Sequence, residues 1–150
     1  MRRIVVGTDG SEHSRAALDW AWDEATLWHA SLDVVHAWLY PYAYGHRITV
    51  SEPVELVKLD AGHLLDHEVS ELRARKHTGT GDGDGDVELH AHLIEGSPSE
   101  VILREGKDAD LIVVGSRGRG GFLSLMLGSV AHQVSNHATC AVVVVRSPDA

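Results

Sequence analysis

Short runs rich in β-branched residues alternate with longer stretches of helical periodicity, and this alternation restricts the possible folds more than any other feature of the sequence. The runs that predict strands lie at 3–8, 32–38, 87–94, 110–114 and 141–145. Strands separated by helices require right-handed crossovers, which produce a parallel sheet with helices on both faces. We therefore predict an α/β fold, with a single doubly wound domain over residues 1–150. The last two runs contain almost no polar residues, as strands buried on both faces require.

The intervening segments predict helices from their apolar spacing and from one start signal. The apolar positions that recur at helical spacing are Ala17, Leu18, Ala21, Ala25 and Trp28; Val57, Ala61, Leu64, Leu65 and Leu72; and Val130, Ala131, Val134 and Ala138. Another helix is expected to begin at Ser97, with Pro98 in its first turn and Glu100 completing a capping box.

Composition and charge exclude several classes of protein. The formal net charge is −9 and no lysine or arginine cluster is present, so we expect no nucleic-acid partner. No apolar run is long enough to span a bilayer, and the first residues lack the pattern of a secretory signal. The single cysteine, Cys140, excludes an internal disulfide framework and suits a reducing compartment. Cytoplasm is therefore the expected location, without a membrane contact.

Two glycine-containing loops predict a ligand site. One follows the first strand and reads Gly7-Thr8-Asp9-Gly10-Ser11, and the other follows the fourth strand, with glycines at 115, 118, 120, 121 and 128. In open parallel sheets, ligands bind beyond the carboxyl ends of the strands, where the strand order reverses. If the first and fourth strands are neighbours, both loops open into one crevice. Bare backbone amides there, and the first turn of a helix beginning at Gly128-Ser129, would hold phosphate groups.

Known phosphate-binding and catalytic motifs are absent from these loops. The sequence lacks GxxxxGK[ST], GxGxxG after the first strand, and GxSxG, so it predicts no P-loop, dinucleotide-binding dehydrogenase or α/β-hydrolase. A glycine-rich turn without a ligand is the alternative interpretation. Arg117 and Arg119 either contact phosphate or simply solvate the loop. The apolar stretch 122–127 is expected to pack as a lid or core plug.

Gly115-x-x-Gly118, followed by nine residues and then Gly128-Ser129, matches the G-2x-G-9x-G-[S/T] pattern of ATP-binding universal stress proteins. The segment "IVVGTDGSEHSRAAL" resembles the first strand and loop of that family, and "ATCAVVVVR" is similar to its closing strand. The resemblance covers nearly the whole chain and is poor only in 39–52 and in 77–86. It implies an adenine nucleotide alpha hydrolase-like fold, in which a five-stranded sheet has the order 3-2-1-4-5.

The resemblance also implies a nucleotide site and a dimer. In it, Asp9 accepts hydrogen bonds from adenosine, Ala37 lines the adenine pocket, the loop after the fourth strand wraps ribose and phosphates, and the segment from Gly128 holds the triphosphate. The full set of implied site residues is Gly7, Thr8, Asp9, Ala37, Val114, Gly115, Ser116, Arg117, Gly118, Gly128, Ser129 and Val130. Mg²⁺ would be bound through the phosphates rather than by the protein directly. A homodimer would form through the last strand, 141–146.

Two other functions remain open on the sequence alone. One is a slow ATPase or nucleotidyl transferase, for which His132 and His137 are the nearby candidate residues. The other is a protein-interaction scaffold that binds no nucleotide. Zinc binding by His63 and His67 lacks a third ligand, and the segment 82–86 lacks the remaining positions of a calcium loop. His90 and His92 share one strand face, where one of them could be a core histidine.

Overall fold

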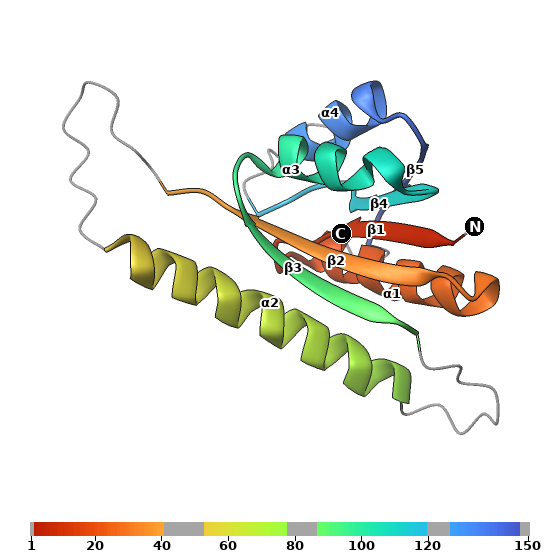
Figure 1. The fold of residues 1–150 in the computed structure, drawn as a ribbon, viewed down its shortest axis with the longest axis horizontal. Helices are drawn as coiled ribbons and strands as arrows, with labels where there is room; N and C mark the ends of the chain where they lie inside the picture. The colour runs from red at the N-terminus through yellow and green to blue at the C-terminus, as the bar shows by residue number, and fades with distance from the viewer. Residues whose placement is uncertain (1, 41–52, 78–86, 120–126, 148–150) are drawn as a thin grey trace.

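The computed structural model describes residues 2–40, 53–77, 87–119 and 127–147 and contains one parallel sheet of five strands (Figure 1). The strands are β1 (Arg3–Gly7), β2 (Ser31–Trp38), β3 (Leu89–Glu95), β4 (Leu111–Gly115) and β5 (Ala141–Val145). Their order is β3-β2-β1-β4-β5, and every neighbouring pair is parallel. The predicted fold class and strand order are confirmed. The ends of each predicted strand agree with those of the observed strand to within two residues.

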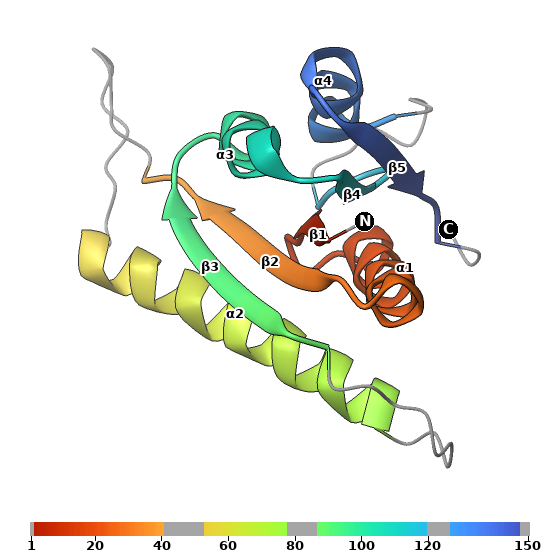
Figure 2. The same cartoon turned by 45° about the vertical axis from the view of Figure 1, so that its right-hand side comes forward.

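Helices cover both faces of the sheet, as Figures 1 and 2 show. The helices α1 (Glu12–Trp28) and α2 (Val54–His77) lie on one face, and α3 (Pro98–Glu105) and α4 (Ser129–His137) lie on the other. A short 3-10 turn, Gly106–Asp108, follows α3. Successive side chains of a strand point to opposite faces, so β1 contributes Ile4 and Val6 to the core under α1 and Val5 to the core under α3 and α4.

The three inner strands, β2, β1 and β4, are largely buried, and the two edge strands are not. Ile4, Val5 and Val6 of β1 have no exposed surface, and β4 is buried from Leu111 to Val114. By contrast β5 is partly exposed along its length. The prediction that the last strand is buried on both faces is therefore wrong in this chain, because β5 lies at the edge of the sheet. Within the described part of the chain, one edge of β5 has no strand partner. Proteins usually cover or pair such an edge when its side chains are apolar.

The first helix begins and ends with identifiable caps. Ser11 is its N-cap and accepts a hydrogen bond from the backbone N–H of Ser14 at 3.2 Å, and His29 ends it in the left-handed region at φ 49°. Trp28 was expected on the buried stripe but is 52% exposed, and its indole donates to Glu24 instead. The prediction that Trp28 is buried is wrong, because this residue is the last of the helix. The buried tryptophan of α1 is Trp22.

Ion pairs join α2 to α1. The buried Glu68 accepts hydrogen bonds from both Nε and Nη2 of Arg15, and two further pairs, Arg75 with Asp19 and Lys76 with Asp23, continue the row toward the end of α2. Of the predicted apolar stripe of this helix, Ala61, Leu65 and Leu72 are buried, while Val57 and Leu64 are partly exposed. The apolar contact of α2 is therefore narrow, and the buried Glu68 supplements it. Its two hydrogen bonds from Arg15 fix the position of α2 relative to α1, since bidentate arginine–carboxylate pairs have a defined geometry.

The start of α3 departs from the sequence expectation in one respect. Ser97 is the N-cap and Pro98 stands in the first turn, but the Ser97 side chain makes no capping hydrogen bond. The predicted capping box is therefore wrong.

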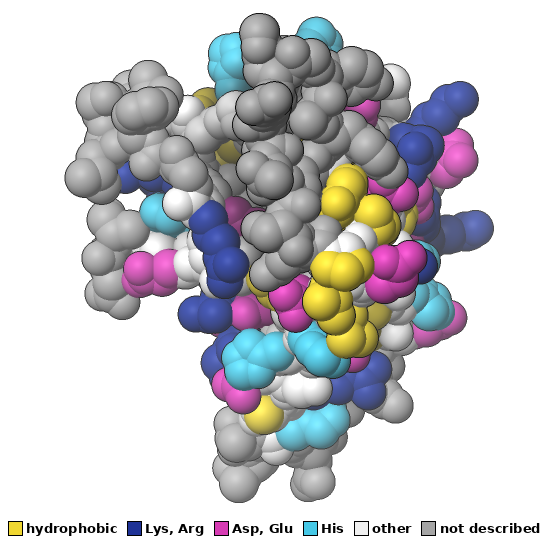
Figure 3. Space-filling model, turned by 90° about the vertical axis from the view of Figure 1, so that its left-hand side faces the viewer, with side chains coloured by type: hydrophobic (Ala, Val, Ile, Leu, Met, Phe, Trp, Pro, Cys, Tyr) yellow, Lys and Arg dark blue, Asp and Glu magenta, His cyan; other side chains and the backbone are white. Residues whose placement is uncertain are grey.

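Among the described residues no helix is both long and apolar enough to cross a membrane. Figure 3 shows one face, on which acidic, basic and histidine side chains mix around a small hydrophobic patch.

Candidate functional site

A cavity of about 520 Å³ opens beyond the carboxyl ends of β1 and β4. These strands are direct neighbours, with Ile4 paired to Leu111 and Val6 to Val113, so the loops that follow them lie side by side. Ligand pockets in proteins commonly span about 300–1,000 Å³. The residues that line the cavity are Gly7, Thr8, Asp9, Ser14, Val35, Ala37, Pro98, Ile102, Val114, Gly115, Arg117, Gly118, Arg119, Gly128, Ser129, Val130 and Ala131.

The loop after β1 is fixed by short polar side chains. The Thr8 backbone N–H donates to the carbonyl of Val35 at 2.9 Å, and its hydroxyl lies 3.3 Å from that of Ser14. Gly10 follows with φ 75°, a left-handed conformation that favours glycine. The buried His36 ring places Nδ1 2.8 Å from the Thr8 carbonyl. A carbonyl only accepts, so His36 donates from Nδ1 and fixes the position of Thr8 in this loop.

The carboxylate of Asp9 joins the two loops. Its Oδ1 accepts from the Ser11 backbone N–H at 2.9 Å, and its Oδ2 accepts from the Arg119 backbone N–H at 3.0 Å. Partial burial raises the pKa of Asp9, but the hydrogen bonds from Ser11, Arg119 and Ser14 outweigh it and bring this pKa below its ordinary value of 3.8. Asp9 therefore stands ionised in the cavity wall at neutral pH, beside the cationic residues Arg117 and Arg119.

The loop after β4 is built around Ser116. The Ser116 backbone N–H donates to the Val145 carbonyl and its own carbonyl accepts from the Gly128 N–H, both at 2.7 Å. A Cβ at Gly118 would lie 2.6 Å from Oδ2 of Asp9, and one at Gly115 would lie 2.7 Å from the backbone of His13. At Gly115 a side chain would meet backbone atoms of α1 that cannot move aside, whereas at Gly118 it would displace the Asp9 carboxylate from its hydrogen bond to Arg119.

The first turn of α4 faces the cavity. Gly128 is the N-cap and has no side chain with which to cap the helix, so Ser129, Val130 and Ala131 present first-turn backbone N–H groups at the cavity wall. The helix dipole adds partial positive charge at the same end. Together with Arg117 and Arg119, this end of the cavity suits an anionic group.

The opposite part of the cavity is apolar. Val35 and Ala37 from β2, Pro98 and Ile102 from α3, and Val114 from β4 line it. Ile102 packs so closely on β1 that a Cβ at Gly7 would lie 2.6 Å from its Cδ1. A narrow apolar wall next to an anion-binding wall fits a ligand with a flat hydrophobic group at one end and negative charge at the other.

The structure brings together eleven of the twelve residues expected at the site. The exception is Ser116, which is buried outside the lining and whose hydroxyl lies 3.2 Å from Nδ1 of His13. Sequence reasoning missed five lining residues, because residues inside helices and strands carry no local signal of a site when the fold alone brings them there. These residues are Ser14, Val35, Pro98, Ile102 and Ala131. The predicted lid or plug at 122–127 lies outside the described residues except for Leu127, and so do most of 39–52 and 77–86.

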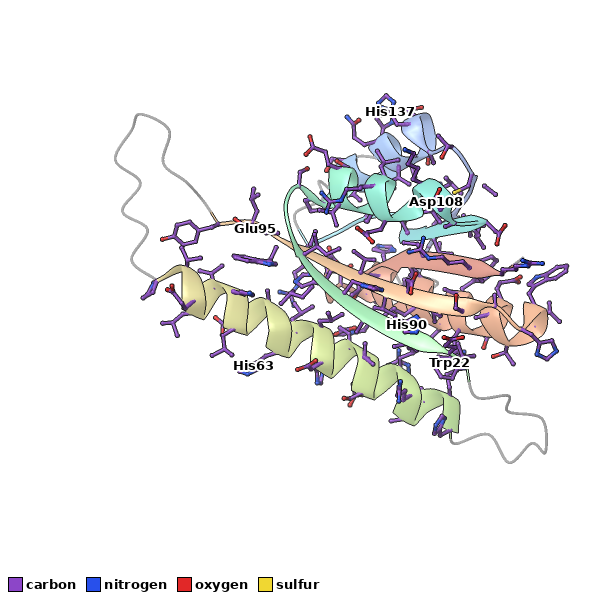
Figure 4. All side chains as sticks on the ribbon, in the orientation of Figure 1. Trp22, His63, His90, Glu95, Asp108 and His137 are labelled. Carbon is purple, nitrogen blue, oxygen red and sulfur yellow. The ribbon has the colours of Figure 1, made fainter. Side chains whose placement is uncertain are left out.

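None of the histidines that the structure describes lines the cavity. Figure 4 shows His63 on α2 and His137 on α4, which cover opposite faces of the sheet. Over the described parts of the chain, no three or more histidine, cysteine or acidic side chains are placed to hold a metal ion. Neither His90 nor His92 is a core histidine: His90 is exposed, His92 is partly exposed, and both contact Asp33. The buried histidine of the sheet is instead His36.

The fold and the cavity define a class, the doubly wound α/β proteins with a cavity where the strand order reverses. A model of the universal stress protein family matches residues 1–146, and the chain belongs to that family. The universal stress protein Rv1996 of Mycobacterium tuberculosis is 34% identical over 149 residues, which cover 97% of this chain and 44% of that protein. The chain thus spans less than half the length of this curated relative.

Two solved structures share the fold over nearly the whole chain. A universal stress protein in complex with cAMP has a TM-score of 0.70 at 23% identity and covers 97% of both chains. The universal stress protein from Archaeoglobus fulgidus in complex with dAMP has a TM-score of 0.66 at 24% identity, covering 97% of this chain and 98% of that one. At these identities, the likeness supports the fold.

Proposed function

We propose that the protein binds ATP in this cavity and acts as a nucleotide-dependent regulatory protein. The observation that carries the proposal is the division of one cavity into an apolar wall and an anion-binding wall, the latter made by both glycine-containing loops and the start of α4. Adenine fits between Ala37, Ile102 and Val114, and the phosphates meet the amides of Ser129 and Val130. Mg²⁺ bound to the phosphates would neutralise part of their charge.

Several features of the site support a nucleotide over an uncharged ligand. The close approach at Gly118 leaves no space for a side chain between its loop and Asp9. The carboxylate of Asp9 has lone pairs beyond the two that accept from Ser11 and Arg119, and these can accept from ribose or adenine. Solved relatives of the same fold hold cAMP and dAMP, which are adenine nucleotides too.

We further propose a homodimer through residues 141–146. In the five-stranded sheet β5 has a neighbour on one side only, and its side chains are aliphatic and partly exposed. A second copy that paired there would cover these valines and satisfy the strand edge. The nucleotide would then act by changing what the dimer presents to a protein partner, in the cytoplasm.

The first experiment asks whether the protein retains nucleotide. Native mass spectrometry of gently purified protein should show a mass increment equal to ATP, and equilibrium binding should prefer ATP over GTP. A protein without bound nucleotide and without ATP affinity would instead support the scaffold interpretation. Neither His132 nor His137 lines the cavity, so no observed contact favours the enzyme interpretation.

A glycine variant tests the site itself. Gly118→Val should abolish ATP binding, because even a Cβ at this position meets Asp9 Oδ2 at 2.6 Å. Gly62→Ala is the matched control: its Cβ would meet only Leu93 at 3.6 Å, and alanine in a helix stabilises by about 0.5–1 kcal/mol relative to glycine. Isothermal titration should show unchanged ATP affinity in the control. Unchanged affinity in Gly118→Val would contradict the proposed site.

A further inference from the structure

His13, in the first turn of α1, links two segments that are far apart in the sequence. Its Nδ1 accepts a hydrogen bond from the Ser147 backbone N–H at 3.0 Å, and the Ser116 hydroxyl lies 3.2 Å from the same nitrogen. Ser116 and Ser147 are both buried. Thus one side chain contacts the loop that follows β4 and the segment that follows β5.

These contacts determine where the imidazole proton lies. A backbone N–H only donates, so the Nδ1 of His13 must be an unprotonated acceptor. The ring then carries its hydrogen on Nε2, and the Ser116 hydroxyl donates to Nδ1, whose single lone pair it shares with the Ser147 N–H. Glu12, the preceding residue, reinforces the link because its Oε1 accepts from the Ser147 hydroxyl at 3.0 Å.

Ser116 transmits this link to the cavity. Its backbone N–H is bonded to Val145 at the end of β5, and its carbonyl accepts from Gly128, the N-cap of α4. Its neighbour Gly115 packs against the backbone of His13 without space for a Cβ. The position of Ser116 therefore sets both the start of α4 and the distance between the loop and β5.

We propose that His13 is a positioning residue for the cavity: its unprotonated Nδ1 fixes Ser116 against the segment after β5, so that the loop after β4 and the end of β5 move as one unit. The part of this inference that concerns ligand affinity rests on the proposed nucleotide-binding function. The coupling itself does not, and it connects the cavity to the strand edge at which we propose the dimer.

The test compares two variants of the full chain that differ in one property. His13→Asn keeps an acceptor, since Oδ1 of asparagine stands the same number of bonds from the backbone as Nδ1 of histidine. His13→Leu removes the acceptor at similar bulk. His67→Leu, on the exposed side of α2, controls for the loss of a histidine. The readouts are amide hydrogen exchange at Ser116, Gly128 and Ser147, and ATP affinity by titration calorimetry.

His13→Leu should speed exchange at all three amides and weaken ATP binding, each by about tenfold, the effect of losing hydrogen bonds of ordinary strength. His13→Asn should restore both, and His67→Leu should change neither. In the wild-type protein, ¹⁵N spectra should show His13 protonated on Nε2 and not on Nδ1.

Three results would overturn the inference. They are faster exchange at Ser147 alone, an asparagine variant that behaves like the leucine variant, and a protonated Nδ1 at neutral pH. If the leucine variant does not fold, the asparagine variant and the ¹⁵N spectra still decide. If the wild-type protein binds no ATP, the proposed function fails, whereas the exchange rates at Ser116 and Gly128 still test the coupling.

Discussion

Two aspartates at opposite ends of the sheet, Asp9 and Asp33, have pKa values below the ordinary one but reach that state in different ways. Burial raises the pKa of Asp33, and hydrogen bonds from Arg3, His92 and His90 outweigh it. Asp9 instead accepts from the backbone N–H groups of Ser11 and Arg119. Asp33 is 4% exposed and lies outside the cavity lining, whereas Asp9 is partly exposed and lines the cavity.

The comparison shows how a carboxylate with a lowered pKa can serve either the fold or a site. The carboxylate of Asp33 on β2 contacts side chains of both neighbouring strands, β1 and β3. Its hydrogen bonds therefore hold these three strands together. Asp9 holds loops by their backbone, which leaves its remaining lone pairs at the surface of a cavity. We therefore expect changes at Asp33 to lower stability without changing ligand affinity, and changes at Asp9 to do mainly the reverse.

The largest effect is expected from Asp33→Ala. Removing the buried carboxylate takes the ion-pair partner from Arg3, whose guanidinium keeps only the Glu105 carbonyl as an acceptor. Because about a third of the Arg3 side chain is exposed, we expect a loss of about 2–3 kcal/mol, at or below the lower end for a broken buried pair. Urea unfolding should show this loss of free energy, and the folded variant should bind ATP as the wild-type protein does. An unchanged unfolding midpoint would show that Asp33 does not hold the strands, and the contrast with Asp9 would disappear.

Asp9→Ala should lower the free energy of unfolding by less, about 1–2 kcal/mol, because its partners are backbone amides of an exposed residue, Arg119, and a partly exposed one, Ser11, which water can reach. ATP affinity should fall by about tenfold or more, since the variant loses both an acceptor and the bond that places Arg119. Calorimetry and urea unfolding on the same preparation separate the two quantities. Full ATP affinity in this variant would remove Asp9 from the site.

Much of the fold and part of the site follow from the sequence. The β-branched runs predict all five strands, because a parallel sheet needs short apolar segments separated by helices. The spacing of Gly115, Gly118 and Gly128 predicts a loop in close contact, since only glycine permits it. That β1 and β4 are neighbours was predicted from the resemblance to a family, because periodicity alone does not determine the order of strands in a sheet.

What the sequence could not predict are the partners of individual side chains. Asp33 and its contacts from β3 depend on the register between strands, which the order of residues does not reveal. Ser116 belongs to the motif by position, yet its hydroxyl is directed to His13 because the chain after β5 returns there. Trp28 fits the helical stripe of α1, but it is the last residue of that helix and its side chain is half exposed.

Acid should remove part of what Asp33 contributes. A carboxyl whose pKa is lowered in the folded state stabilises the protein above its unfolded value of 3.8, and that contribution is lost as pH falls below 3.8. The difference in free energy of unfolding between the wild-type protein and Asp33→Asn should be constant from neutral pH to mild acid and then narrow below pH 3.8. A difference that widens with acid would mean that the pKa of Asp33 is raised.

The smallest expected effect compares two helix caps, one beside Asp9 and one remote from it. Ser11 accepts from Ser14 at the start of α1 and donates its own N–H to Asp9, whereas Ser97 makes no capping bond through its side chain. Ser11→Ala should cost about 1 kcal/mol, the usual effect of losing a serine cap, and Ser97→Ala should cost about half of that or less. Urea unfolding resolves this difference. Alanine keeps the backbone N–H that donates to Asp9 but removes the Ser11 hydroxyl, which also helps to lower the pKa of Asp9. We therefore expect only a small loss of ATP affinity in Ser11→Ala, and a loss as large as that of Asp9→Ala would show that the hydroxyl of Ser11 positions Asp9.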